Sequence, residues 1–312
     1  MRKSYLVTGG AGFIGSHIVE KLVAAGNFVR VLDNFSSGRL RNLKDCRGKI
    51  EILRGDIRSE VSCLKATKGI QYVLHQAALR SVPKSLLDPK GYNEVNIQGT
   101  LNMLSASLKN KVRAFVFASS SSVYGEAKVF PEREDFLPAP ISPYALTKLA
   151  GEHYCRMFSH HYGLPTVSLR YFNVFGPRQS LDDEYAVVIP KFISCLLKDV
   201  QPPIYGNGRQ SRDFTYVENV VMANILAAGN ATCRGEVFNI ANGKDHTVLD
   251  LVRILNRLMR KSVKPVFLDK RPGDVFRTLA DLSRAKSMLK FSPRVDFETG
   301  LKRTVEYFSK NA

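Results

Sequence analysis

The sequence has few cysteines, and it does not pair them as metal sites and disulfide scaffolds require. The 312 residues include an odd number of cysteines, none in a C-x-x-C pair: Cys46, Cys63, Cys155, Cys195 and Cys233. This scatter argues against a zinc site and favours a reducing compartment. We therefore expect a cytoplasmic protein that holds no metal.

Also missing is any apolar run that approaches the ~20 residues of a membrane-spanning helix. Residues 1–26 superficially resemble a signal peptide, because Arg2 and Lys3 precede an apolar stretch. Four glycines interrupt that stretch, however, and charged residues follow it without a small-residue cleavage site. We expect no contact with a membrane.

The chain lacks a compact run of Lys or Arg, although its formal net charge is +18. From Leu251 onward, 15 Lys and Arg stand against 6 Asp and Glu. Such an excess can indicate nucleic-acid binding. Here the basic residues are spread along predicted helices and strands, without an aromatic-interleaved RNA-binding motif. We interpret them as a basic, solvated surface and expect no nucleic-acid partner.

A glycine-rich segment near the N-terminus has the order of elements that a dinucleotide site requires. Residues 4–8 form a short β-prone run, and 13–25 follow an amphipathic helical pattern. Between them, the G-x-x-G-x-x-G spacing of Gly9, Gly12 and Gly15 allows a tight turn and the close approach of a pyrophosphate. Glycines are common in turns, so the spacing is informative only because a strand precedes it and a helix follows.

A carboxylate ends the second predicted strand, residues 28–32. Asp33 at this position can accept hydrogen bonds from both ribose hydroxyls of NAD but would repel the 2′-phosphate of NADP. Arg39 and Arg41 are close in sequence and suit a phosphate. The pattern favours NAD and leaves NADP open.

Further apolar runs alternate with helical patterns and predict a doubly wound parallel sheet of the α/β class. The later predicted strands are residues 50–53, 71–75, 114–118 and 166–171. Ligands of such sheets bind beyond the carboxyl ends of the strands. Asp56 and the serine tetrad at 119–122 follow strands directly, so we expect them at that edge. A simple polar turn would also explain the serines.

After about residue 178 the strand–helix alternation loosens, and a chain of this length exceeds the ~250–300 residues of one core. We predict a Rossmann domain at 1–178 and a smaller α/β lobe at 179–312. Within the second part, the pattern predicts helices at 189–197, 218–228 and 248–259 and strands at 212–217 and 237–240. Segments near 213–240 are expected to return to the first domain.

Ser142-Pro143 predicts the start of a helix, because Ser can cap a helix and Pro suits its first position. From there, Tyr144 and Lys148 are four residues apart and share one helix face. An ammonium beside a phenol stabilises the phenolate, which can then act as a base near neutral pH. Such pairs also occur by chance, so this one needs support from the rest of the chain.

Together, the glycine triplet, Asp33, the serine tetrad before Val123-Tyr124-Gly125 and Tyr144-x-x-x-Lys148 resemble the extended short-chain dehydrogenases/reductases. Over nearly the whole chain the resemblance is to the NAD-dependent nucleotide-sugar epimerases and dehydratases. Within that family, the chain most resembles the members that act on UDP-glucose and UDP-N-acetylglucosamine. It implies a Rossmann fold, bound NAD and a UDP-sugar in the second lobe. It also implies a homodimer through a four-helix bundle of the helices near 92–108 and 144–161.

The resemblance also assigns roles to residues. Tyr144 would take the proton of the sugar 4-hydroxyl while C4 gives a hydride to NAD. Lys148 would lower the pKa of Tyr144 and bind the nicotinamide ribose, and Ser120 would hydrogen-bond the reacting oxygen. The other implied cofactor-binding residues are Gly9, Gly12, Phe13, Ile14, Gly15, Asp33, Asn34, Ser37, Gly38, Asp56, Ile57, Gln76, Ala77, Ala78, Asn96, Ser119 and Tyr171. The implied substrate-binding residues are Arg80, Ser81, Ser121, Ser122, Asn173, Val187, Val188, Tyr205, Arg212, Arg271, Asp274 and Thr278.

The reaction is predicted from carboxylates that relatives have and this chain lacks. Dehydrating relatives carry an Asp-Glu pair after the residue that matches Ser120, and decarboxylating relatives carry Glu at the position of Ser122. Neither is present here. A UDP-hexose 4-epimerase with tightly bound NAD is therefore predicted. The alternatives are a 4-epimerase of UDP-glucuronate or UDP-N-acetylglucosaminuronate and, third, a non-catalytic nucleotide-sugar or RNA-binding module.

Two positions concern the sugar itself. The loop at 76–85 resembles that of epimerases acting on UDP-N-acetylglucosamine and its acid, except that Arg80 replaces a small residue. Thr278 occupies a position where glucose-only relatives carry a bulky Tyr, which leaves room for a 2-acetamido group. We expect both plain and N-acetylated hexoses to be accepted.

Overall fold

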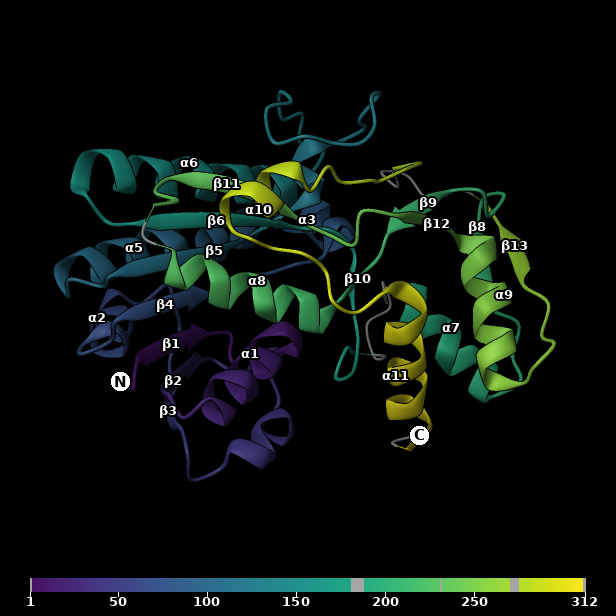
Figure 1. The fold of residues 1–312 in the computed structure, drawn as a ribbon, viewed down its shortest axis with the longest axis horizontal. Helices are drawn as coiled ribbons and strands as arrows, with labels where there is room; N and C mark the ends of the chain where they lie inside the picture. The colour runs from purple at the N-terminus through teal and green to yellow at the C-terminus, as the bar shows by residue number, and fades with distance from the viewer. Residues whose placement is uncertain (1, 181–187, 231, 270–274, 311–312) are drawn as a thin grey trace.

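The computed structural model describes residues 2–180, 188–230, 232–269 and 275–310. Its largest element is a seven-stranded sheet in which every pair of neighbours is parallel, in the order β11-β6-β5-β4-β1-β2-β3 (Figure 1). The strands are β1 Ser4–Thr8, β2 Phe28–Asp33, β3 Glu51–Arg54, β4 Tyr72–His75, β5 Ala114–Ser120, β6 Thr166–Tyr171 and β11 Glu236–Ile240. The predicted doubly wound parallel sheet is confirmed.

The strand order reverses at β1, which has β2 on one side and β4 on the other. In register, Thr8 pairs with Leu32 of β2 and with His75 of β4. The carboxyl ends of the three strands therefore lie side by side, and the loops that follow them open into one crevice, which is the ligand position in sheets of this topology.

Helices cover both faces of the sheet. Successive side chains of each strand point to opposite sides, so both faces carry apolar residues that must be buried. The helices on and around the sheet are α1 Phe13–Ala24, α2 Glu60–Thr67, α3 Val82–Leu87, α4 Pro89–Tyr92, α5 Gly99–Lys109, α6 Pro143–Tyr162, α8 Val217–Gly229 and α10 Ser283–Met288. In β1, Tyr5 and Val7 join a core with α1 and α8, whereas Leu6 joins a core with α2, α5 and α6.

Two boundaries differ from the prediction. The helix expected to begin near residue 92 begins at Pro89, capped by Asp88, and passes through a π-helical segment, η2 Asn93–Gln98, before α5. The strand expected at 212–217 is split into β9 Ser211–Asp213 and β10 Thr215–Tyr216. Phe214, between the two, is buried in the core of the second region, so the chain changes partner there.

A second, smaller region has its own core and lies beside the sheet (Figure 1). Its elements are β7 Val174–Phe175, α7 Val188–Leu197, β8 Pro203–Tyr205, β9, β10, β12 Asp245–Thr247, α9 Val248–Met259, β13 Val266–Leu268 and α11 Phe297–Lys310. The chain leaves the sheet after β6, returns with α8 and β11, and then leaves again. Two short 3-10 helices, η1 Leu40–Cys46 and η3 Ser121–Tyr124, complete the fold.

The part of the chain that the structure describes lacks two kinds of feature. None of its helices combines the length and apolarity needed to cross a membrane. No cluster of three or more His, Cys, Asp or Glu side chains in this part of the chain could hold a metal ion. All five cysteines are free and buried.

Candidate active site

The glycine loop between β1 and α1 is packed too closely for larger residues. A Cβ on Gly15 would lie 2.2 Å from the carbonyl oxygen of Gly9, and a Cβ on Gly9 would lie 2.9 Å from the backbone nitrogen of Ala77. At Gly12, no side chain caps the N-terminus of α1, and its first turn holds no acidic residue. Backbone N–H groups and the positive end of the helix dipole are thus available to an anion, and the pyrophosphate of NAD fits this site.

Gly15→Ala is expected to weaken NAD binding about tenfold, because about 1–3 kcal/mol of overpacking strain must be relieved by moving the loop. Calorimetric titration of the NAD-free protein measures this. Gly229→Ala is the matched control, since a Cβ there meets nothing within 4 Å. Unchanged affinity in a folded Gly15→Ala protein would contradict the assignment.

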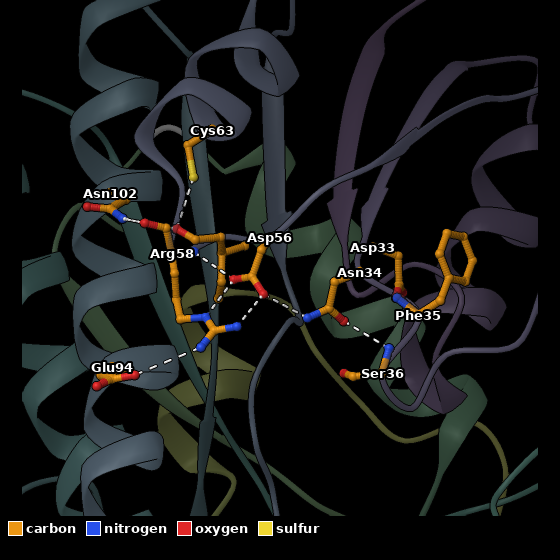
Figure 2. A network of polar contacts seen from close by, with 10 residues as sticks. Asp33, Asn34, Phe35, Ser36, Asp56, Arg58, Cys63, Glu94 and Asn102 are labelled. Atoms are coloured by element: carbon orange, nitrogen blue, oxygen red, sulfur yellow. Dashed lines mark hydrogen bonds and ion pairs between the residues drawn. The ribbon is translucent and has the colours of Figure 1, made fainter.

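Two carboxylates at the ends of β2 and β3 face the same crevice, with Asn34 between them (Figure 2). Asp33 accepts hydrogen bonds from the backbone N–H groups of Ala11 at 2.9 Å and Phe35 at 2.8 Å. Its oxygens keep lone pairs for ribose hydroxyls. The Nδ2 of Asn34 donates to Asp56 at 2.9 Å, which ties the two strand ends together.

Sequence reasoning missed Arg58, which holds Asp56 in place (Figure 2). Its Nε and one terminal nitrogen donate to the two oxygens of Asp56 at 3.1 and 2.9 Å. These bonds hold the pKa of Asp56 well below its usual range, at about 2. Asp56 is therefore an ionised hydrogen-bond acceptor at neutral pH. The spacing Asp-x-Arg was the available signal.

A closed ring of amide and phenol groups lies at the ends of β4 and β6. Tyr171 donates to Oε1 of Gln76 at 3.2 Å and accepts from Nδ2 of Asn224 at 2.7 Å. Nε2 of Gln76 donates to Oδ1 of Asn224 at 3.0 Å. Burial raises the pKa of Tyr171, so its phenol stays neutral and fixed. Asn224 is on α8, far away in sequence, and no local pattern pointed to it.

A buried ion pair stands behind the serine tetrad. Glu152 of α6 binds Arg170 of β6 through two bonds of 2.9 and 2.7 Å and accepts a 2.5 Å bond from Oγ of Ser119. Both charged side chains are about 4% exposed. Contrary to the expectation that the tetrad follows the strand, Ser119 and Ser120 lie within β5. Glu152, which sequence reasoning missed, holds the first of these serines against α6.

The helix start at Ser142 brings Tyr144 to the crevice. Ser142 caps α6 by accepting from the N–H of Ala145, and Pro143 follows at the first helical position. Burial raises the pKa of Tyr144, whereas a hydrogen bond with Ser120 and the positive charge of Arg80 lower it. Ser120 therefore contacts the phenol of Tyr144, and the catalytic roles expected of the two residues stay predictions.

Lys148 is buried on the same helix as Tyr144. Its ammonium donates to the carbonyl oxygen of Ala118 at 2.8 Å and lies 5.9 Å from the centre of the Tyr144 ring. Burial lowers the pKa of Lys148 to about 8. The ammonium thus contacts both β5 and the Tyr144 ring, and its predicted effect on the pKa of Tyr144 stays a prediction.

Most of the predicted cofactor residues line one crevice. Those that line it are Gly9, Gly12, Phe13, Ile14, Gly15, Asp33, Asn34, Ser37, Asp56, Ile57, Gln76, Ala77, Ala78, Ser119, Tyr144 and Tyr171. Leu32, Ser36, Gly55, Leu79, Arg80, Val95 and Ala118 complete the lining. The exposed Arg39 and Arg41 are not part of it.

Four predicted residues lie behind the lining. Lys148 and Ser120 contact Ala118 and Tyr144, as described above. A Cβ on Gly38 would lie 2.8 Å from an Asp33 oxygen, so this glycine packs against the carboxylate. Asn96 is buried and bonds to Leu79 and Thr147 rather than facing the crevice. It supports the cofactor site through the loop after β4.

Of the predicted substrate residues, three come together from distant segments. Nδ2 of Asn173 donates to Oγ1 of Thr278 at 2.9 Å, and Thr278 exchanges backbone hydrogen bonds with the strand that carries Arg212. Arg212 is buried and donates to the carbonyls of Ser211 and Phe276.

The remaining substrate predictions fall at element ends. Ser81 caps α3, Val188 begins α7 and Tyr205 ends β8. Ser121 and Ser122 are in η3, and Oγ of Ser120 donates to Oγ of Ser122 at 3.1 Å. Val187, Arg271 and Asp274 lie outside the described residues.

Comparison with known proteins defines the class that this fold and site represent. A family model described as the NAD dependent epimerase/dehydratase family matches residues 5–241. The chain belongs to this family, and within it to the NAD-dependent UDP-sugar 4-epimerase group of enzymes. NAD is its cofactor, as predicted.

Three relatives illustrate the range of the family. A putative UDP-glucose 4-epimerase of Methanocaldococcus jannaschii is 38% identical over 308 residues, covering 98% of each chain. The solved UDP-N-acetylglucosamine 4-epimerase of Methanobrevibacter ruminantium, in complex with UDP-N-acetylmuramic acid, is 42% identical. It has a TM-score of 0.96 and covers 100% of this chain and 99% of its own. A UDP-N-acetyl-alpha-D-glucosaminuronate decarboxylase of Bacillus cytotoxicus is 36% identical, covering 99% of this chain and 98% of its own.

Proposed function

We propose that this enzyme is a UDP-hexose 4-epimerase, which oxidises C4 of the sugar and reduces it again on the opposite face. The observation that carries the proposal is the distribution of carboxylates. Among the described residues that line the crevice, the acidic side chains are Asp33 and Asp56, at the ends of β2 and β3. Glu152 is buried and bound by Arg170. Tyr144 is thus the acid–base group at the end of the crevice where Ser119 lies.

The chain's own groups divide the work as follows. Tyr144, as phenolate, takes the proton of the 4-hydroxyl and returns one after the sugar has turned over. Ser120, bonded to Tyr144, orients the reacting oxygen. NAD, held by the glycine loop, Asp33 and Asp56, would supply the acceptor and then the donor of the C4 hydride. The sugar presents its other face to the same phenol, so no second acid–base residue is required.

The sugar specificity we propose includes both plain and N-acetylated hexoses. Thr278 is buried beside Asn173, and its side chain is shorter than the Tyr of glucose-only relatives, which is the reason we expect room for a 2-acetamido group. The relatives named above include a putative 4-epimerase of UDP-glucose, a 4-epimerase of UDP-N-acetylglucosamine and a decarboxylase of a UDP-linked uronate. The lack of a carboxylate at Ser121 and Ser122 supports epimerisation over decarboxylation.

An assay with UDP-glucose, UDP-N-acetylglucosamine and UDP-glucuronate, followed by nuclear magnetic resonance, tests the proposal. We expect the 4-epimers of the first two. Loss of carbon dioxide from UDP-glucuronate would identify a decarboxylase. Epimerisation of UDP-glucuronate alone would support the uronate alternative, and turnover of none would support a binding module.

We further propose a homodimer through α5 and α6, in the cytoplasm. Leu146 and Met157 are eleven residues apart on one face of α6 and are 55% and 44% exposed, and Leu86 and Leu87 of the neighbouring α3 are also exposed. Burying such a face against a second copy would remove apolar surface from water. The five free, buried cysteines support a reducing compartment. Light scattering should give twice the chain mass of 34.9 kDa. A single-chain mass would contradict the dimer.

A further inference from the structure

The hydrogen-bonded ring of Gln76, Tyr171 and Asn224 has a single arrangement of its hydrogens. Nδ2 of Asn224 donates to the backbone carbonyl of Val220 at 2.8 Å, and also to the Tyr171 hydroxyl. A carbonyl can only accept, so the nitrogen of this amide must lie on that side and its oxygen must face Gln76. Gln76 then donates to that oxygen through Nε2 and accepts from Tyr171 through Oε1. One carbonyl of α8 therefore fixes the direction of all three hydrogen bonds.

One donor of this ring is left over. Nε2 of Gln76 carries two hydrogens, and in the part of the chain that the structure describes it has a single acceptor, Oδ1 of Asn224. Asn224 is fully buried and is not part of the crevice lining. Gln76 is partly exposed and lines the crevice. Its second N–H is thus available to a ligand in the crevice.

The position of this donor matches the nicotinamide half of NAD. The glycine loop that fits the pyrophosphate follows β1, and Asp33, which fits the adenosine ribose, ends β2. The other half of the dinucleotide must extend in the opposite direction, across the ends of β4, β5 and β6. Gln76 directly follows β4 and Tyr171 ends β6. The nicotinamide carries one hydrogen-bond acceptor, the oxygen of its carboxamide, and this oxygen is the partner that the donor requires.

We propose that Gln76 donates its second amide N–H to the carboxamide oxygen of NAD, and that Asn224 is a positioning residue that holds the amide in this orientation. Without Asn224, the amide of Gln76 is free to turn over and present its own oxygen, which repels the carboxamide oxygen. The inference concerns the cofactor, so it holds for any UDP-sugar that the enzyme accepts.

The hydrogen bond also has an electronic consequence. Reduction of nicotinamide gives its ring nitrogen a lone pair that is conjugated to the carboxamide oxygen, so this oxygen is a better acceptor in NADH than in NAD. A donor at this point should therefore bind the reduced form more tightly and favour transfer of the hydride to the cofactor.

Calorimetric titration of the NAD-free enzyme with NAD, NADH and ADP-ribose, which lacks the nicotinamide, tests the proposal. Gln76→Met keeps the length of the side chain and removes its amide. It should weaken binding of NAD about threefold and of NADH about tenfold, the range of a neutral hydrogen bond, and leave ADP-ribose unchanged. Asn224→Leu should weaken NADH more than NAD in the same way. Because Asn224 acts through Gln76, the double variant should lose no more than Gln76→Met alone.

Gln98→Met is the matched control. Nε2 of Gln98 donates to Oδ1 of Asn102 at 2.9 Å, so the variant removes the same kind of bond from an exposed position outside the crevice lining. Binding of all three ligands should be unchanged.

Three results would overturn the inference. Equal weakening of NAD and ADP-ribose in Gln76→Met would mean that the side chain only shapes the crevice. Equal losses for NAD and NADH would contradict the electronic effect, and additive losses in the double variant would contradict the role of Asn224. Should a variant not fold, the unmutated enzyme decides with thionicotinamide adenine dinucleotide, in which sulfur replaces the carboxamide oxygen. This analogue should bind about threefold more weakly than NAD, and equal binding would contradict the proposal.

Discussion

Tyr144→Phe is expected to lower kcat for UDP-sugar epimerisation by about 10²–10⁴-fold, the usual contribution of a general base. The phenol is the group that meets both Ser120 and the cofactor crevice, and the described carboxylates of that crevice lie at the ends of β2 and β3. NAD should stay bound, because the glycine loop, Asp33 and Asp56 are untouched. Steady-state kinetics, with mass spectrometry of the denatured protein to quantify NAD, measures both.

Tyr162→Phe provides the control for this variant. Tyr162 is at the other end of the same helix and is 57% exposed, so removal of its hydroxyl should leave kcat unchanged. A Tyr144→Phe enzyme with wild-type turnover would contradict the proposed mechanism. Loss of NAD together with activity would instead give Tyr144 a structural role in cofactor binding.

Glu152→Ala is expected to lower the free energy of unfolding by about 3–5 kcal/mol, because it leaves the buried Arg170 guanidinium without its partner. One terminal nitrogen of Arg170 already lacks a hydrogen-bond partner among the described residues, so the variant would leave further donors of this guanidinium unsatisfied. Arg170 also stacks on the Tyr124 ring, 4.6 Å from its centre, and without Glu152 the guanidinium would no longer be held in that position. Urea denaturation of the two proteins gives the difference.

Glu298→Ala removes the same chemical group from a surface pair with Arg257, in which the side chains are 57% and 63% exposed. Exposed pairs contribute about 0–1 kcal/mol, so this control should unfold almost as the wild type does. Equal losses in the two variants would contradict the view that Glu152 holds the interface between β5, β6 and α6.

The sheet was predictable because its signals are local. Each buried strand is an apolar run bounded by turn residues, and the glycine triplet stands between β1 and α1, where the chain itself shows what lies on either side. The position of Tyr144 near the start of α6 was predictable for the same reason, since Ser142 and Pro143 mark the start of that helix. The consecutive strands β9 and β10 were predicted as one, because the pattern does not show that Phe214 between them is buried in a second core.

The partners of the site residues were less predictable, because they come from distant segments. Asn224 reaches Gln76 across 148 residues and Glu152 reaches Ser119 across 33. Neither has a local motif that shows what it will bind. Lys148 illustrates a related limit. Its spacing from Tyr144 placed both residues on one helix, but the sequence does not show that the carbonyl oxygen of Ala118 accepts a hydrogen bond from its ammonium.

The central claim is that one phenol and one bound NAD invert C4 by removing and returning the same hydride. Incubation of the enzyme with UDP-galactose carrying deuterium at C4, without added cofactor, tests it directly. We predict conversion to UDP-glucose with the deuterium retained at C4, seen by nuclear magnetic resonance and mass spectrometry. Inversion with loss of the deuterium to solvent, or release of water from the sugar without inversion, would contradict the claim.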